Sequence, residues 1–280
     1  MQHGPLVAAF SSSAVAYSSL LIGGRPSLQA FVVAFVTCLL FFLQLRIADE
    51  FKDAEEDAKF RPYRPVPRGL IQLRELGVLF ALGALVQALM AWFLEPWLLV
   101  VLAIAWAYLA LMSVEFFARD WLKARPITYL WTHMLIMPIV DFFATACHWL
   151  PEGRKPWLGL GLFLGASFFN GIVIEVGRKL RQPEAEEEGV PTYSRLWGLK
   201  NASLVWIFAM LTTAAFAIAA AWMIGFSVVL AGMLALVFLW GMWIRAGWEK
   251  ATSKQFELVS GVWTLILYLG LGLLPLFLLR

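Results

Sequence analysis

The chain has 280 residues, of which 61% are hydrophobic and only 15% are charged, and its formal net charge is +3. Soluble domains carry roughly 45–50% apolar and about 25% charged residues, so this composition excludes an ordinary soluble protein. The small net charge gives no reason to expect a nucleic-acid partner. Cys38 and Cys147 lie in apolar segments without metal-ligand spacing, so we expect packed thiols rather than a metal site.

Nine apolar segments follow one another along the chain, separated by stretches that carry Gly, Pro or charged residues. Each is close to the length of about 20 residues that an α-helix needs to cross a bilayer. The first segment lacks a basic start and a small-residue cleavage site, so we do not expect a removable signal. The sequence predicts an all-α, polytopic membrane protein with about nine transmembrane helices, cytoplasmic cap loops and one domain over residues 1–280. The predicted helices lie near 6–22, 28–47, 74–94, 97–117, 126–149, 157–177, 201–223, 226–244 and 258–279.

The distribution of basic residues predicts the orientation of this bundle. If nine helices alternate in direction, four long loops share one face with the N-terminus, and that face collects 18 of the 22 Lys and Arg residues. Loops rich in Lys and Arg stay in the cytoplasm. We therefore expect an integral protein of a bacterial inner (cytoplasmic) membrane with a cytoplasmic N-terminus. The loops concerned are 48–73, 118–125, 178–200 and 245–257.

An acidic cluster closes the second predicted helix. Asp49, Asp53 and Asp57 are spaced by four residues, so a continuing helix places them on one face. Like charges at this spacing destabilise a helix, and a bound cation would reverse that effect. Oxygen ligands without His or Cys indicate Mg²⁺, which takes one or two carboxylates and completes its shell with phosphate. The alternative is a solvated, charged helix end, because Lys52 and Glu55 are interspersed among the aspartates.

The segment that follows, 60–69, contains three Arg and three Pro residues in ten positions. Proline fixes the backbone and stiffens the loop. Arginine presents a planar fork that suits phosphate oxygens, so Arg61 and Arg64 are candidate phosphate ligands. A carboxylate stripe beside a rigid arginine loop is what a metal-bound diphosphate would need.

With these two features side by side, the chain resembles the UbiA superfamily of intramembrane prenyltransferases. That family has nine transmembrane helices and a signature N-D-x-x-D-x-x-x-D, followed by R-P-x-x-x-G. Here Asp49 stands at the Asn position, Glu50 replaces the next Asp, and Asp53 and Asp57 match the later Asp positions. Residues 64–69 match the loop. In helix count and cytoplasmic loops the resemblance covers essentially the whole chain.

The second acidic signature of the family follows the sixth helix, and this chain departs from it. Glu175 stands for the first Asp, but Lys179 occupies the position four residues on. The resemblance then implies one strongly held Mg²⁺, with Lys179 and the neighbouring Arg178 taking over part of a cation's role against phosphate. The ending, 189–198, fits the family pattern. The acidic run 184–188 could supply late metal ligands, but we expect a solvated loop.

Other polar residues have both a functional and a structural interpretation. Lys123 and Arg125 lie in a basic stretch where the family binds diphosphate, yet they could merely obey the positive-inside rule. His133 could reach an acceptor substrate or be a packed, hydrogen-bonded residue. Asn170 is a secondary polar contact. Asp141 lies deep in the fifth helix, where a carboxylate should face the bundle interior, and we prefer a structural hydrogen bond to a neighbouring helix.

The resemblance implies Mg²⁺-dependent transfer of a prenyl group from an isoprenyl diphosphate to a small aromatic or lipid-like acceptor. It also implies that membrane lipids surround the protein. Alternatives are a related transferase or cyclase that uses another phosphorylated lipid or sugar donor, and a non-enzymatic membrane protein that binds or transports a divalent cation or lipid. The predicted metal ligands are Asp49, Asp53, Asp57 and Glu175. The predicted catalytic residues are Asp53, Asp57 and Lys179. The predicted substrate contacts are Arg61, Arg64, Lys123, Arg125, Arg178, Asn170 and His133.

Overall fold

The computed structural model describes residues 4–279, and this part of the chain is helical, without a β-strand. Eight of its helical spans are long and apolar enough to cross a membrane, and α5 adds a shorter apolar helix of 16 residues. The predicted all-α membrane fold is confirmed. The long helices are α1 (Gly4–Ile22), α2 (Leu28–Lys52), α4 (Leu73–Leu94), α5 (Leu98–Ser113), α7 (Pro126–Met134) continued by α8 (Ile136–Trp149), α9 (Leu158–Gly177), α11 (Leu199–Trp222), α12 (Ser227–Ala246), and α13 (Ser253–Leu271) continued by α14 (Leu273–Leu279).

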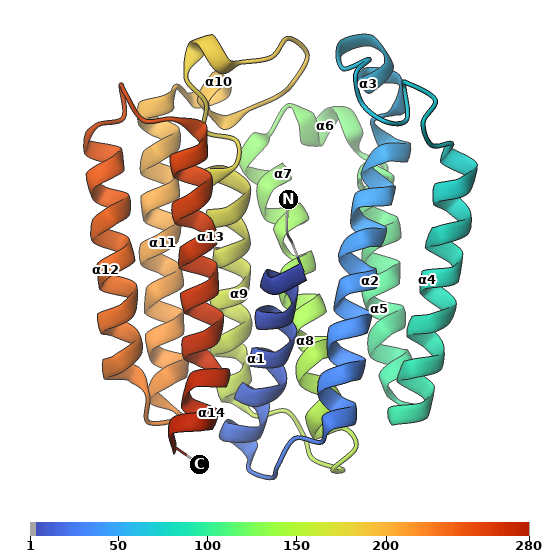
Figure 1. The fold of residues 1–280 in the computed structure, drawn as a ribbon, viewed down its shortest axis with the longest axis vertical. Helices are drawn as coiled ribbons and strands as arrows, with labels where there is room; N and C mark the ends of the chain where they lie inside the picture. Colours follow the sequence, from blue (N-terminus) through green and yellow to red (C-terminus); the bar gives the residue numbers. More distant parts are fainter. Residues whose placement is uncertain (1–3, 280) are drawn as a thin grey trace.

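The remaining elements are short and gather at one end of the bundle (Figure 1). We call this end, with its connecting loops, the loop end. In Figure 1, α2, α4 and α5 stand on one side and α9, α11, α12 and α13 on the other, with α1, α7 and α8 between them. The short elements are α3 (Ala54–Phe60), η1 (Glu115–Phe117), α6 (Arg119–Lys123), η2 (Pro183–Ala185) and α10 (Tyr193–Trp197).

Most predicted helix boundaries agree with the structure within a few residues, but the fourth span, predicted as 97–117, is too long. α5 ends at Ser113, and Glu115, Phe116 and Phe117 then take φ values of 51°, 52° and 57°. A left-handed conformation costs about 1–2 kcal/mol for each residue that carries a side chain. This turn therefore persists only because surrounding contacts hold it.

A second break divides the predicted span 126–149 at Leu135. Pro138, in the first turn of α8, has no N–H to donate to the carbonyl of Met134, four residues earlier. The missing bond explains why α7 ends at Met134 and α8 begins as a separate segment.

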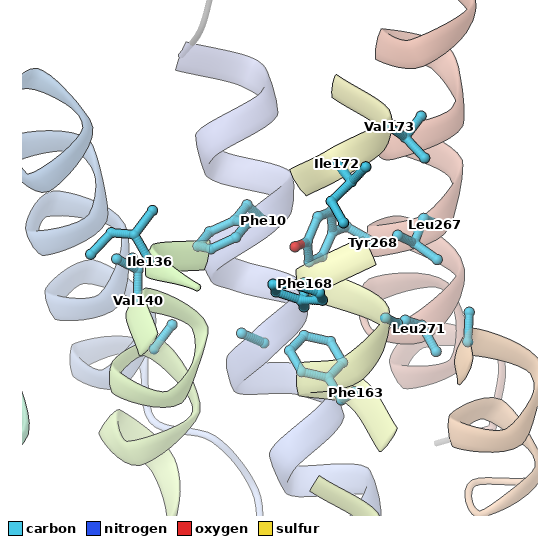
Figure 2. Packing of buried hydrophobic residues seen from close by; sticks show 14 of the residues in the cluster. Phe10, Ile136, Val140, Phe163, Phe168, Ile172, Val173, Leu267, Tyr268 and Leu271 are labelled. Carbon is cyan, nitrogen blue, oxygen red and sulfur yellow. The ribbon is translucent and has the colours of Figure 1, made fainter. Parts of the chain in front are cut away.

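Aromatic side chains from α1, α9 and α13 fill the centre of the bundle (Figure 2). The ring of Phe10 lies 5.0 Å from that of Tyr268, and the ring of Phe163 lies 6.1 Å from it. The Tyr268 hydroxyl donates a hydrogen bond of 2.9 Å to the fully buried carboxylate of Asp141 on α8. Asp141 thus connects two helices, which is the structural role that we preferred from the sequence.

The helices α1 and α13 approach closely at Gly272. A Cβ atom at this position would lie 2.3 Å from the backbone oxygen of Ser13 and 2.4 Å from its Cα. Membrane helices pack closely where small residues let their backbones approach. Because the obstacle is backbone rather than a flexible side chain, the contact depends on glycine at position 272.

We therefore expect Gly272→Ala to lower the free energy of unfolding by about 1–3 kcal/mol, the usual cost of overpacking a core. The matched control is Gly261→Ala on α13, where a new Cβ would meet no atom within 4 Å. Thermal unfolding in detergent measures both variants. Equal midpoints for the two would contradict the close approach.

Candidate active site

The three aspartates of the first acidic signature remain on one face, although α2 ends at Lys52. Asp53 links α2 to α3, and the backbone bonds continue across it: Asp53 N donates to Asp49 O over 2.9 Å, and Asp57 N to Asp53 O over 2.7 Å. The four-residue ladder of a helix is thus preserved. The predicted acidic stripe is present, but its three side chains have different surroundings.

Asp57 is only 1% exposed and is held by the arginine loop. Its Oδ1 lies 2.9 Å from Arg61 Nη2, and its Oδ2 accepts a hydrogen bond from Arg64 Nη1. Arg64 also lies 3.5 Å from Glu50. One predicted metal ligand therefore fixes two of the predicted phosphate-binding arginines.

Asp49 and Asp53 are less strongly paired. The Asp49 side chain is 45% exposed, and its Oδ1 lies 3.9 Å from Lys52 Nζ, which is too far for a hydrogen bond. Burial raises the pKa of the Asp53 carboxyl; Lys52 lowers it, while Asp49 and Asp57 raise it, and the pKa ends above its ordinary value. A further cation beside Asp53 would stabilise the charged form of its carboxylate.

The second acidic signature lies at the end of α9. Glu175, 8% exposed, accepts from Lys179 Nζ at 2.8 Å and from Arg178 Nε at 2.6 Å. Glu175 and, less strongly, Asp49 raise the pKa of the Arg178 guanidinium. The ends of α2 and α9 therefore lie within electrostatic reach of each other, as a shared diphosphate site requires.

The loops that follow α3 and α9 also meet. The Tyr63 hydroxyl donates to Glu187 Oε2 over 2.8 Å, and Arg181 Nη1 donates to the other oxygen of Glu187 over 2.9 Å. The Phe60 ring packs against Gly189, where a Cβ would come within 2.4 Å of the ring. Gly189 also has a φ of +72°, so its lack of a side chain serves both the turn and the contact.

The acidic run 184–188 is largely exposed, as we expected of a solvated loop, but two of its glutamates form hydrogen bonds. Besides the contacts of Glu187, the carboxylate of Glu186 accepts hydrogen bonds of 2.7 Å from the hydroxyls of Thr192 and Ser194. Two of these glutamates therefore shape the loop itself. The bonds join residues six to eight positions apart, and such contacts were not evident from composition.

The site fits one magnesium ion better than two. Among residues 4–279, no group of three or more His, Cys, Asp or Glu residues is arranged to hold a metal. Asp57 and Glu175 are committed to Arg and Lys partners. Asp49 and Asp53 keep carboxylate oxygens for one Mg²⁺, whose remaining ligands would be diphosphate oxygens and water.

The structure does not bring Lys123 and Arg125 to the aspartates of α2. Lys123 Nζ lies 3.0 Å from Glu56, with about half of its side chain exposed. Arg125 donates to the carbonyl of Trp121 and stacks 4.4 Å from its ring. Lys123 thus contacts α3 and Arg125 contacts α6, and this geometry favours the positive-inside interpretation.

His133 and Asn170 both contact other protein groups. His133 Nδ1 lies 2.9 Å from the carbonyl of Tyr129, and Nε2 lies 3.3 Å from Glu115 Oε2. Both ring nitrogens face oxygens, so contact with an acceptor substrate would require His133 to give up one of them. The fully buried Asn170 accepts a hydrogen bond of 3.1 Å from Thr264, while its Nδ2 has no hydrogen-bond partner among the described residues, so a contact of Asn170 with substrate stays a prediction.

Glu115 is a residue of this site that sequence reasoning missed. It is 4% exposed and lies 3.2 Å from Lys52 Nζ and 3.3 Å from the Tyr129 hydroxyl. Burial alone would raise the pKa of its carboxyl, but contacts with His133 and Lys52 outweigh burial and lower it to about 2. The available signal was a lone Glu at the end of an apolar run, which we included in the predicted helix.

Comparison with known proteins agrees with this arrangement. The structure of a UbiA homolog from Aeropyrum pernix K1 is similar, with a TM-score of 0.74, 15% identity, and coverage of 96% of this chain and 97% of that one. A structure described in a study of digeranylgeranylglyceryl phosphate synthase has a TM-score of 0.61, 14% identity, and coverage of 94% and 92%. No curated protein matches in sequence. Residues 9–266 match the UbiA prenyltransferase family, and the chain belongs to that family.

Proposed function

We propose that this protein transfers a prenyl group from an isoprenyl diphosphate to a small aromatic or lipid-like acceptor, with Mg²⁺. The observation that carries the proposal is the weakly paired carboxylates of Asp49 and Asp53 at the end of α2, beside Asp57, which holds Arg61 and Arg64. Asp49 also acts on Arg178 at the end of α9. Membership of a prenyltransferase family supports it. A diphosphate between these helix ends would meet carboxylates through the metal on one side and fixed cations on the other.

The chemistry follows from where charge develops. The bond between the prenyl carbon and the diphosphate oxygen breaks, and its electron pair leaves with the diphosphate. Mg²⁺ would neutralise part of that charge. Arg61 and Arg64, fixed by Asp57, and Lys179, fixed by Glu175, would stabilise the rest, because donors held in place need not reorganise during the reaction.

The allylic cation would then be captured by the acceptor, which forms the new bond and loses a proton to solvent. Aromatic faces stabilise such cations by about 0.5–2 kcal/mol each. The ring of Trp131 on α7 lies 5.0 Å from that of Phe168 and 5.9 Å from that of Phe169 on α9. We propose that these rings shield the prenyl cation below the diphosphate.

The most direct test is an activity assay on the wild-type protein and on Asp53→Asn. Purified protein supplied with geranylgeranyl diphosphate and Mg²⁺ should release pyrophosphate, and EDTA should stop the release. Asp53→Asn should reduce the rate by ~100-fold or more, since a preorganised electrostatic contact to the transition state is typically worth that much. Aromatic acids and a glycerol-phosphate lipid serve as trial acceptors, the latter because of the synthase described for one structural neighbour.

The control is Glu55→Gln, because Glu55 is an exposed carboxylate of the same segment. It should leave the rate unchanged. Pyrophosphate release that survives both EDTA and Asp53→Asn would contradict the proposal. Divalent-cation flux into proteoliposomes without diphosphate turnover would favour a transport function instead.

We also propose that the loop end faces the cytoplasm. Cys38 and Cys147 are buried and can be replaced by Ala to give a cysteine-free background. In intact bacterial cells an impermeant maleimide should label Lys155→Cys, at the opposite end of the bundle, and not Glu55→Cys. The reverse labelling pattern would contradict this orientation.

A further inference from the structure

Lys52 on α2 and Lys179 after α9 have closely matching surroundings. Lys52 Nζ lies 3.2 Å from Glu115 and 6.0 Å from the centre of the Tyr129 ring. Lys179 Nζ lies 2.8 Å from Glu175 and 5.7 Å from the centre of the Tyr193 ring. Each ammonium group is therefore held between a buried carboxylate and an aromatic ring.

A further ring makes each arrangement rigid. Tyr129 stacks on His133 with ring centres 3.8 Å apart, and Tyr193 stacks on Trp197 with ring centres 4.9 Å apart. We call these sets the Lys52 group (Lys52, Glu115, Tyr129, His133) and the Lys179 group (Lys179, Glu175, Tyr193, Trp197). Lys52 is the last residue of α2 and Lys179 follows the end of α9, and these two helices stand apart in Figure 1.

The two groups face a common region. Lys52 lies 3.9 Å from Asp49, and Asp49 also acts on Arg178, the neighbour of Lys179. Burial raises the pKa of the Tyr193 phenol, and the charges of Glu175 and then Tyr129 raise it further. Asp49, one of the carboxylates proposed to hold Mg²⁺, therefore contributes to the surroundings of both Lys52 and the residue next to Lys179.

Lys52 retains donor capacity toward this region. An ammonium group has three N–H donors. Among the described residues, Glu115 and the Tyr129 hydroxyl, at 3.2 and 3.3 Å, occupy two of them, while Asp49 at 3.9 Å is beyond hydrogen-bond distance. The left-handed turn at Glu115–Phe117 presents the Glu115 carboxylate to Lys52. A strained turn that fixes a lysine with a spare donor beside the acidic stripe points to a ligand.

We propose that Lys52 binds the diphosphate from the α2 side, opposite Lys179, and that Glu115 and Tyr129 are its positioning residues. The proposal rests on the proposed function and adds a phosphate contact that neither acidic signature supplies. Diphosphate carries negative oxygens on both of its phosphorus atoms, and Lys52 and Lys179 would each reach one end of it. Glu115 holds the Lys52 ammonium group at 3.2 Å, so that Lys52 stays 3.9 Å from Asp49. The Asp49 carboxylate is then available to bind the metal.

Binding without turnover tests this proposal. The probes are inorganic pyrophosphate and a geranylgeranyl thiodiphosphate whose bridging sulfur prevents cleavage, each with Mg²⁺ and measured by isothermal titration calorimetry. Lys52→Met should weaken binding by about 10- to 100-fold, the value of a hydrogen bond to a charged group, and Lys179→Met should do the same. The control is Lys59→Met, because Lys59 is an exposed lysine of α3 that lies over Phe60.

Three milder variants separate positioning from folding. Lys52→Arg should recover most of the affinity that Lys52→Met loses. Tyr129→Phe keeps the ring that stacks on His133 and removes only the hydroxyl contact. It should lower the affinity for both probes several-fold and leave the thermal unfolding midpoint unchanged. Glu115→Gln should lower the affinity for both probes more than Tyr129→Phe does, because it removes the charge that holds Lys52.

The outcomes distinguish the two proposals. If the wild-type protein binds the probes and Lys52→Met binds them as tightly as Lys59→Met does, the role of Lys52 is overturned while the proposed function stands. If the wild-type protein binds neither probe, both proposals fail. Loss of affinity in Lys52→Met with recovery in Lys52→Arg supports the inference.

Discussion

The loop end depends on buried carboxylates that hold cations in place. Asp57, Glu115 and Glu175 are each less than a tenth exposed, and each contacts two basic side chains. Removing one partner of such a pair leaves an uncompensated buried charge, which is strongly destabilising. The acids of this region therefore divide by burial. The buried ones position Arg and Lys side chains, and the more exposed Asp49 and Asp53 remain available for a metal.

The membrane fold could be predicted from the sequence because its signals are local. An apolar run of sufficient length, ended by Gly, Pro or charge, identifies a transmembrane helix without knowledge of its neighbours. The arginine loop was also evident, since Pro and Arg alternate within 60–69. Spacing placed the three aspartates on one face, and the backbone ladder across Asp53 agrees with it.

Partner choice could not be predicted in the same way. Asp57 has the spacing of a metal ligand, yet its side chain pairs with Arg61 and Arg64, because burial beside two guanidinium groups favours ion pairs. In the sequence Lys52 indicates a solvated helix end, but the fold brings Glu115 to it from 63 positions away in the chain. The left-handed turn at Glu115 contains no glycine, the residue that would have indicated such a turn in the sequence. Contacts of this kind arise only when distant segments pack.

The contact between the loops after α3 and α9 has a consequence for access. The contact consists of a solvent-exposed hydrogen bond from Tyr63 to Glu187 and the packing of Phe60 on Gly189. Separating two such groups disturbs far less structure than displacing any of the helices beneath them. Water replaces the lost bond at once, because both partners are already hydrated. The two loops can therefore separate along this line while the helices beneath them keep their packing.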